Sequence, residues 1–221
     1  MKKAICLMSG GLDSTVAAAW TKERYEVYGL HVDYGQRAAR LEREASKRVS
    51  QKLQISEFKS THLSWLKELG TSALTDESIS IPRGQISLTD QIPITLVPFR
   101  NGILLSLATA WAEVVGAEAV VIGAVEEDSS GYPDCREQFL IAFERAVELG
   151  TRPEIDVRIV APLVHKSKVD IVKLGAKLGV PFELSWSCYG SGPEPCNDCE
   201  SCLLRRRGFD GAGISDPLLD R

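Results

Sequence analysis

Long apolar runs are missing from this 221-residue chain. No stretch approaches the roughly 18 consecutive apolar residues that a membrane-spanning helix needs. The chain starts with Met1-Lys2-Lys3, as a signal peptide would. The apolar run that follows, residues 4–8, is too short for one and leads into two glycines. We therefore expect a cytoplasmic protein without a membrane partner.

A surplus of basic residues is missing as well. The 26 Lys and Arg residues are outnumbered by 30 Asp and Glu residues, which gives a net charge of -4. Broad nucleic-acid binding needs a basic face, so this composition disfavours a nucleic-acid partner and favours small-molecule substrates. The run Arg205-Arg206-Arg207 is a local exception, and most such runs are solvated helix faces.

Short apolar runs alternate with segments of helical period. The pattern predicts strands over residues 4–8, 25–32, 58–63, 119–123 and 156–161, and helices over residues 12–23, 38–53, 101–116, 137–149 and 167–178. This alternation predicts an α/β fold, a doubly wound parallel sheet with helices on both faces. Such sheets bind ligands at the carboxyl ends of their strands, near a switch in strand order.

Two segments interrupt the alternation. Residues 70–93 are polar and rich in Ser, Thr and Gly, and a loop of this length is typical of a lid or of disorder. From Ser185 onward the chain is rich in Cys, Gly and Pro and has little periodicity. We therefore expect an ATP-binding catalytic domain over residues 1–184 and a small metal-bound tail over residues 185–221.

The string Ser9-Gly10-Gly11-Leu12-Asp13-Ser14-Thr15 joins the first expected strand to the first expected helix. Glycines let the backbone turn sharply and come close to a ligand, and free N–H groups at a helix start favour phosphate. The string lacks the lysine of the GxxxxGK[ST] loop and is not a GxGxxG sequence. An ordinary strand–turn–helix with a capping serine is the plainer interpretation.

Asp13 is unusual within a phosphate-binding loop. A carboxylate repels phosphates unless a cation intervenes, and Mg²⁺ prefers oxygen ligands. We therefore expect Asp13 to help hold Mg²⁺ together with ATP.

Four of the six cysteines are clustered: Cys188, Cys196, Cys199 and Cys202 have the spacing C-x7-C-x2-C-x2-C. Four thiolates within a short span can close a tetrahedral Zn²⁺ site, which has no open position and is therefore structural. A redox Cys-x-x-Cys pair and an iron–sulfur cluster are the rival interpretations. Cys6 lies in an apolar strand and is expected to be buried.

Further candidate residues follow the expected strands. Arg100 could hold a phosphate or carboxylate in a fork, and Asn101 could cap the next helix or contact a ligand. Glu126, with Glu127 and Asp128, could bind a metal or a guanine-like edge, or form a solvated loop. Lys166 or Lys168 could neutralise pyrophosphate as it leaves, and we assign this role to Lys166. His165 could be a base, although a lone histidine is more often structural. Cys135 lies in a loop where substrate contacts are common.

The string Ser-Gly-Gly-x-Asp-Ser after an N-terminal strand resembles the signature of the PP-loop ATP pyrophosphatases, whose fold is adenine nucleotide alpha hydrolase-like. Further segments resemble one family within this group, 7-cyano-7-deazaguanine synthase of the queuosine precursor pathway. These are Asp33-Tyr34-Gly35-Gln36-Arg37, Val97-Pro98-Phe99-Arg100-Asn101, the stretch from Ser129 to Arg136 that contains Gly131-Tyr132-Pro133-Asp134-Cys135-Arg136, residues 162–168, and the cysteine tail with Leu203-Leu204-Arg205. The resemblance runs from about residue 3 to Pro217. It departs at Ala38, where the family is expected to have a histidine.

The resemblance implies a reaction. ATP would adenylate the carboxylate of 7-carboxy-7-deazaguanine, ammonia would displace AMP, and a second ATP would activate the amide so that a nitrile forms. It also implies a homodimer with one structural Zn²⁺ in each subunit. Asp13, Arg100 and Lys166 would be catalytic. ATP would contact Met8, Ser9, Gly10, Gly11, Leu12, Asp13, Ser14, Thr15, Val16, Ala17 and Ala18, and Asp33 is a candidate ribose contact or simply a strand-end cap. The substrate would contact Asn101, Glu126, Tyr132, Asp134, Cys135 and Arg136.

Three other functions remain open. A related PP-loop ligase could pass the activated carboxylate to another amine. A tRNA thiolase would need a catalytic cysteine pair and an RNA-binding surface, but this chain is acidic and its clustered cysteines are expected to bind zinc. The synthetase part of an amidotransferase would need a glutaminase domain, for which 221 residues leave no room. A zinc-knuckle module that binds nucleic acid without catalysis would make Asp13 irrelevant, and the intact glycine loop argues against it.

Overall fold

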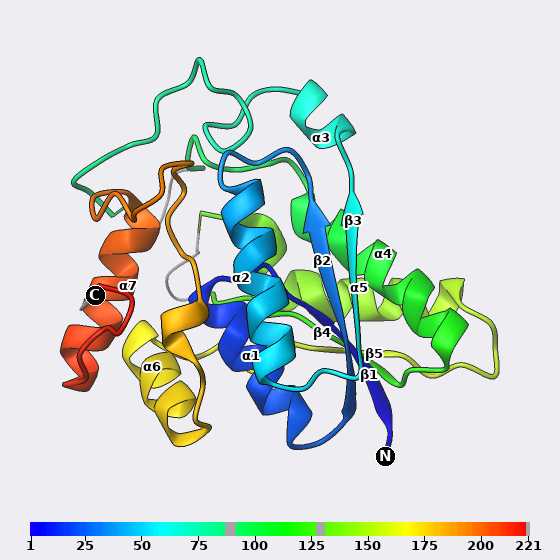
Figure 1. Cartoon of the computed structure of the whole chain (residues 1–221). Coiled ribbons are helices and arrows are strands. Elements are labelled where there is room, and N and C mark those ends of the chain that lie inside the picture. Colours follow the sequence, from blue (N-terminus) through cyan, green and yellow to red (C-terminus); the bar gives the residue numbers. More distant parts are fainter. Residues whose placement is uncertain (87–91, 127–130, 220–221) are drawn as a thin grey trace.

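The fold is centred on a five-stranded parallel sheet. The computed structural model describes residues 1–86, 92–126 and 131–219. The strands are β1 (Lys3–Leu7), β2 (Glu26–Asp33), β3 (Glu57–His62), β4 (Ala119–Val121) and β5 (Arg158–Val160), and they lie in the order β3-β2-β1-β4-β5 (Figure 1). Every neighbouring pair is parallel. The strand order reverses beside β1, because the chain adds β2 and β3 on one side and β4 and β5 on the other.

Helices cover both faces of the sheet. Helices α1 (Leu12–Lys22), α2 (Ala39–Lys52) and α6 (Lys168–Lys177) contribute to one apolar core, and α4 (Arg100–Val115) and α5 (Glu137–Gly150) contribute to the other. The predicted doubly wound α/β fold is thereby confirmed.

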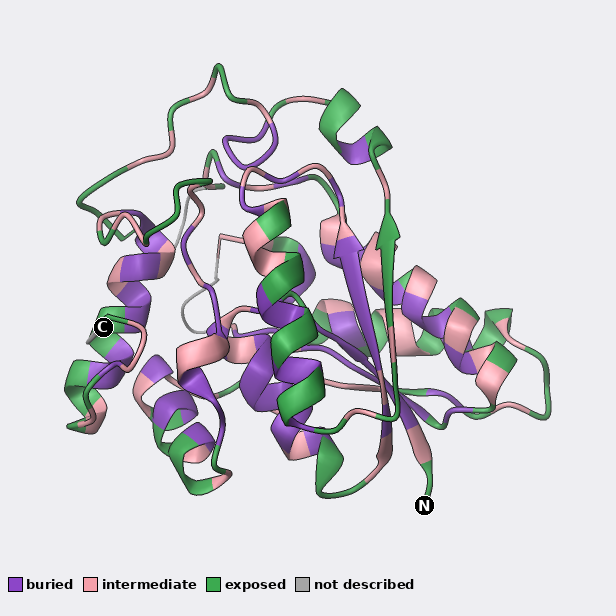
Figure 2. Ribbon diagram, viewed as in Figure 1, coloured by how far each residue is buried: buried purple, intermediate pink, exposed green. Residues whose placement is uncertain are grey.

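The strands supply both cores by alternation. In β1, Ala4 and Cys6 belong to the core under α1, whereas Ile5 and Leu7 belong to the core under α4. Successive strand residues point to opposite faces, so a strand covered on both sides reads as a continuous apolar run. The central strands are accordingly buried along most of their length (Figure 2).

The expected strands and helices coincide with the observed elements to within a few residues at either end. The short helix α3 (Trp65–Glu68) was not expected, nor were the 3-10 turns over Pro133–Cys135 and Phe182–Leu184. No helix within the described residues is long and apolar enough to cross a bilayer.

The cysteine-rich tail contains a helix that the sequence pattern did not indicate. Helix α7 (Glu200–Ala212) follows the cysteines and packs against α6. Its Phe209 meets Phe182 edge to face at a centroid distance of 5.1 Å, inside the core that α1 also lines. A Cβ on Gly208 would lie 3.0 Å from the carbonyl oxygen of Lys168, so glycine permits the close approach of the two helices. Three arginines and two glycines in α7 interrupt the regular spacing of apolar residues by which a helix is predicted from sequence.

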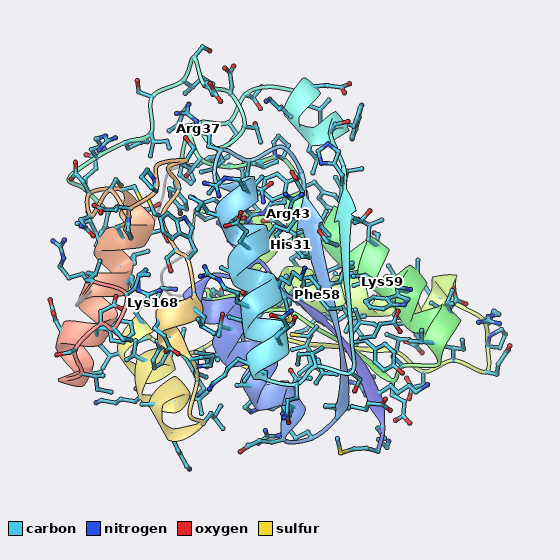
Figure 3. The ribbon with its side chains drawn as sticks, viewed as in Figure 1. His31, Arg37, Arg43, Phe58, Lys59 and Lys168 are labelled. Carbon is cyan, nitrogen blue, oxygen red and sulfur yellow. The ribbon has the colours of Figure 1, made fainter. Side chains whose placement is uncertain are left out.

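The polar loop over residues 70–93 contacts this tail where it is described. The N–H of Gly84 donates to the carbonyl of Asp198 at 2.9 Å, and Arg83 forms an isolated antiparallel bridge with Cys199. Arg37 anchors another part of the loop (Figure 3), because its Nη2 donates to the carbonyls of Asp76 at 2.6 Å and Ile79 at 2.5 Å.

Candidate active site

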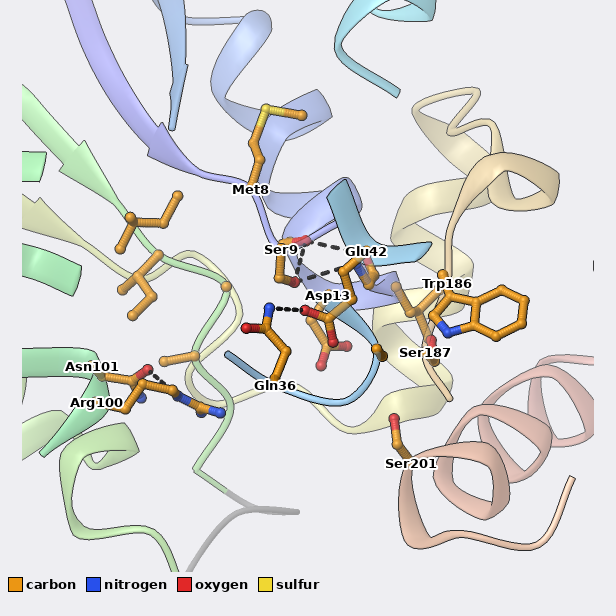
Figure 4. A pocket seen from close by; sticks show the side chains of 18 of the residues that line it. Met8, Ser9, Asp13, Gln36, Glu42, Arg100, Asn101, Trp186, Ser187 and Ser201 are labelled. Carbon is orange, nitrogen blue, oxygen red and sulfur yellow. Dashed lines mark hydrogen bonds between the residues drawn. The ribbon is translucent and has the colours of Figure 1, made fainter. Parts of the chain in front are cut away.

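A cavity of about 270 Å³ opens at the carboxyl ends of β1, β2 and β4, beside the reversal of strand order (Figure 4). This is where doubly wound sheets bind their ligands. Its walls come from the glycine loop, the segment from β2 into α2, the start of α4, the start of α6 and the tail. The charged side chains of the lining are Asp13, Arg37, Glu42, Arg100, Lys168 and Arg205.

The glycine loop is built for a ligand that accepts hydrogen bonds. Gly10 has φ +86°, and a Cβ there would lie 2.5 Å from the carbonyl oxygen of Glu42. The N-cap of α1 is Gly11, and no side chain caps the helix. The first N–H groups of a helix lack partners within it, so those of α1 remain for an anion. Ser9 Oγ accepts from the N–H of Gly11 at 3.2 Å and donates to Ser14 Oγ at 3.0 Å, which shapes the loop.

Asp13 and Lys168 form an ion pair at the mouth of the loop. Lys168 Nζ lies 2.7 Å from Asp13 Oδ2, and the lysine side chain is buried. The second carboxylate oxygen, Asp13 Oδ1, is buried without a hydrogen-bond partner among the described residues. An unpartnered buried carboxylate oxygen is the kind of ligand that Mg²⁺ takes, so the donor set fits the expected cation.

Arg100 presents a fixed positive charge to the cavity. Burial alone would lower the pKa of the guanidinium. The combined effect of Tyr34, Cys135 and Asp134 is larger, so the pKa is raised. Arg100 Nη1 donates to the hydroxyl of Tyr34 at 3.2 Å. An arginine held in this way can neutralise a phosphate or a carboxylate.

Asn101, Asp134 and Cys135 form one buried cluster behind Arg100. The N–H of Asn101 donates to Asp134 Oδ2 at 2.8 Å, and its Nδ2 lies 3.2 Å from Cys135 Sγ. Burial raises the pKa of the Cys135 thiol to about 11, with Arg100 acting in the opposite direction. The thiol is therefore protonated near neutral pH and is poorly suited to act as a nucleophile.

Glu42 is a site residue that the sequence interpretation missed. It lies in the first turn of α2, and its Oε2 accepts from Gln36 Nε2 at 2.7 Å (Figure 4). Burial raises the pKa of this carboxyl to about 7, while the Gln36 hydrogen bond and Arg100 lower it. Glu42 lies on the same face of α2 as the buried Ala45 and Val49, and the sequence interpretation overlooked this carboxylate on a buried helix face.

The structure brings only some of the predicted residues to the cavity. Met8, Ser9, Gly11, Leu12, Asp13, Ser14, Arg100, Asn101 and Cys135 line it. Gly10, Thr15, Val16, Ala17 and Ala18 are buried and are not part of the lining. Lys168 lines it as well, whereas Lys166 lies in the preceding turn and is not part of the lining.

Several other candidates have local roles. Asp33 Oδ1 accepts from the N–H of Gly35 at 2.9 Å, which caps the end of β2. The hydroxyl of Tyr132 lies 2.6 Å from Thr95 Oγ1, and Glu126 Oε2 accepts from the N–H of Glu137 at 3.1 Å. Arg136 is exposed at the start of α5. Glu127 and Asp128 lie outside the described residues.

The four clustered cysteines form a candidate metal centre. The Sγ atoms of Cys188, Cys196, Cys199 and Cys202 all lie within 4.8 Å of one another. Tetrahedral Zn–S bonds of about 2.3 Å place the sulfurs about 3.8 Å apart, so the site fits Zn²⁺. The N–H groups of Gly190 and Cys196 each approach Cys188 Sγ at 3.3 Å, a contact that favours the thiolate.

The tail also reaches the glycine loop and the cavity wall. The N–H of Trp186 donates to the carbonyl of Gly10 at 2.8 Å. Arg205 lines the cavity and forms a buried bidentate pair with Asp216, at 2.5 Å and 2.7 Å. The arginine run of the sequence thus splits, because Arg205 points inward while Arg206 and Arg207 are exposed.

Known proteins are similar to this chain over nearly its whole length. The family model of the queuosine biosynthesis protein QueC matches residues 3–213. The chain is 48% identical over 221 residues to the 7-cyano-7-deazaguanine synthase of Sulfurovum sp. (strain NBC37-1), covering 100% of this chain and 99% of that protein. It is also 48% identical over 219 residues to the enzyme of the same name from Campylobacter curvus (strain 525.92), covering 99% of this chain and 97% of that protein.

A solved structure shares the fold at low identity. It is described as a predicted subunit of tRNA methyltransferase from Methanocaldococcus jannaschii, is 12% identical, and covers 80% of this chain and 75% of that chain with a TM-score of 0.51. At this identity the likeness shows the fold alone.

Proposed function

This chain belongs to the family of the queuosine biosynthesis protein QueC, and from this premise we propose that it is an ATP-dependent ligase. It converts 7-carboxy-7-deazaguanine and ammonia to 7-cyano-7-deazaguanine, the product in the names of its relatives. One geometric observation supports the proposal most directly. The glycine loop, Lys168 and Arg100 line a single cavity, so a nucleotide and a carboxylate can meet there.

The first step activates a poor electrophile. A carboxylate oxygen of the substrate attacks the α-phosphorus of ATP, the bond to the β-phosphate breaks, and pyrophosphate leaves. The N–H groups of the loop and of α1 hold the phosphates. Lys168 and Arg100 offset the charge that develops on the transferred and departing groups. Mg²⁺ held by Asp13 would add further charge neutralisation.

The second step replaces AMP by nitrogen. Ammonia attacks the activated carbonyl carbon, AMP departs, and an amide remains. A second ATP adenylates the amide oxygen, and loss of AMP with the two amide protons leaves the nitrile. The protein contributes mainly by holding the reactants together and by placing fixed charges around them.

The experiment that tests this function is a product assay. Purified protein is incubated with ATP, Mg²⁺, ammonium and 7-carboxy-7-deazaguanine, and products are followed by mass spectrometry. We expect the nitrile with AMP and pyrophosphate, abolished by Asp13→Asn and retained by Asp210→Asn, a change at an exposed carboxylate of α7. An adenylated substrate without nitrile would point instead to a ligase for another amine.

We also propose the identity of the metals. The four thiolates suit a structural Zn²⁺, because a closed tetrahedral site leaves no position for a substrate. Mg²⁺ is supported by the unpartnered Asp13 Oδ1. Elemental analysis of the purified protein tests the first, and the expected result is one zinc for each chain.

A homodimer in the cytoplasm is the assembly that we propose, as the family resemblance implies. Several large apolar side chains are exposed, among them Phe99, Ile141 and Leu149. Sedimentation equilibrium tests the assembly, and a single species with the mass of one chain would contradict it.

A further inference from the structure

Glu42 is a carboxylate of the cavity for which the proposed steps give no role. Its side chain is half-buried, and among the described residues its hydrogen-bond partner is Gln36 and no Lys or Arg forms an ion pair with it. Removing a carboxylate from water without a cation is costly. Burial accordingly raises the pKa of Glu42. A ligand with hydrogen-bond donors would offset this cost.

The carboxylate of Glu42 is held in a fixed orientation. The N–H of Tyr34 donates to Gln36 Oε1 at 2.9 Å, which turns the amide nitrogen of Gln36 toward Glu42. Gln36 is itself buried at 5% exposure, so this contact is pre-organised. A carboxylate offers about four acceptor positions on its two oxygens. One is used by Gln36, and both oxygens keep capacity for a ligand.

The cavity lining contains both acidic and basic side chains. The carboxylates of the lining are Asp13 and Glu42. Asp13 belongs to the glycine loop and is paired with Lys168, so it is committed to the phosphate side. Arg37, Arg100 and Lys168 bring positive charge to the lining, whereas Arg205 is paired with Asp216. Among the described residues of the lining, Glu42 is therefore the carboxylate that is left for a neutral edge rich in donors.

A 7-deazaguanine ring has such an edge. Its N1–H and 2-amino group are adjacent donors that point the same way, and a carboxylate can accept both at once. We propose that Glu42 is the specificity-determining residue that binds this edge and so distinguishes a guanine-type ring from one without the 2-amino group. The inference rests on the proposed function for its choice of nucleobase.

The test is equilibrium binding without turnover. Titration calorimetry on the full chain, with a non-hydrolysable ATP analogue and Mg²⁺ present, compares 7-carboxy-7-deazaguanine with the analogue that lacks the 2-amino group. We expect the unaltered protein to favour the former by about 10- to 100-fold. Glu42→Gln should bind both weakly and equally and should keep its affinity for the ATP analogue. Glu44→Gln is the matched control, since Glu44 is an exposed partner of Arg40 on the same helix.

Three results would overturn the proposal. Glu42→Gln could keep the preference for the 2-amino ring. It could lose affinity for the ATP analogue to the same degree, which would assign Glu42 to support of the glycine loop. In the product assay described above, it could lower kcat alone with an unchanged KM for the nucleobase, which would indicate proton transfer. An unaltered protein that binds neither nucleobase, while it still binds the ATP analogue, would contradict the proposed function and this role of Glu42 with it.

Discussion

The backbone N–H of Trp186 donates to the carbonyl of Gly10 at 2.8 Å, and this hydrogen bond connects the cysteine-rich tail to the glycine loop. Trp186 is buried and its Nε1 donates to the carbonyl of Cys188 at 3.0 Å. Two contacts therefore separate Cys188, a candidate metal ligand, from the glycine with the constrained backbone. The candidate metal centre is thus linked to the glycine loop through Trp186.

Removal of the metal should weaken ATP binding. A structural Zn²⁺ orders the segment that contains its ligands, and loss of that order frees the Gly10 carbonyl. Loss of one net hydrogen bond of about 1 kcal/mol predicts a dissociation constant for an ATP analogue that rises about fivefold or more. Calorimetric titration before chelation, after chelation and after return of Zn²⁺ measures the effect. Unchanged affinity in a folded, metal-free protein would refute the link.

Lys168 and Lys166 provide a paired test of the cavity. Lys168→Met removes a buried charge that faces Asp13 and the phosphates, so kcat/KM should fall about 100- to 1,000-fold. Lys166→Met alters a side chain outside the lining and should keep activity near that of the unaltered protein. Nitrile formation is measured for both, with circular dichroism as a control for folding. The reverse order of effects would restore the role that the sequence assigned to Lys166.

Cys135 should prove dispensable as a nucleophile. Its thiol is protonated because burial raises its pKa to about 11, so Cys135→Ala should lower kcat less than about tenfold, whereas loss of a true nucleophile costs far more. Peptide mapping after brief iodoacetamide treatment at pH 8 should find Cys135 unmodified. A covalent substrate adduct at Cys135, or abolished turnover in the alanine variant, would show that the thiol is activated.

Arg205 should contribute to stability far more than its neighbours in the arginine run. Its bidentate pair with Asp216 is buried, with side chains 4% and 6% exposed. Removal of one partner of such a pair costs about 3–5 kcal/mol, because the other charge is left uncompensated. Asp216→Asn should therefore lower the free energy of unfolding measured with urea. Arg207→Ala, at an exposed position of the same run, should leave it almost unchanged.

The sequence predicted the sheet and the glycine loop because both depend on local patterns. Apolar strands covered on two faces and a glycine pair before a helix are visible without tertiary contacts. The choice between Lys166 and Lys168 was not visible, since it depends on Lys168 reaching Asp13, which lies 155 residues away in the chain. Glu42 and Trp186 were missed for a similar reason. Trp186 is identified by its hydrogen bond to Gly10, far away in the chain, and Glu42 by its place in the cavity lining, which distant segments complete.

Ionisation of Glu42 should make the free energy of unfolding depend on pH. Its pKa is about 7 in the folded protein, above the ordinary value of 4.5, so the folded state keeps a proton that the unfolded chain releases between these values. The protonated Glu42 carboxyl therefore contributes to the stability of the folded state. This contribution is fully present below about pH 4.5 and is lost as the pH rises through about 7. Arg100 from α4 and Gln36 lower the pKa of Glu42, whereas Asp33 at the end of β2 raises it further. The other charged residues of the described cavity lining are Asp13, Arg37, Lys168 and Arg205.

Glu42→Gln removes this ionisation while it keeps a side chain of nearly the same size. The difference in free energy of unfolding between Glu42→Gln and the unaltered protein should therefore move in favour of the variant from pH 5 to pH 8. Urea titrations at both pH values measure it, and Glu44→Gln should show a difference that does not change with pH. If the Glu42→Gln difference were also constant with pH, the carboxyl would titrate normally. Ionisation of Glu42 in the cavity would then have no free-energy cost that a ligand rich in hydrogen-bond donors could offset.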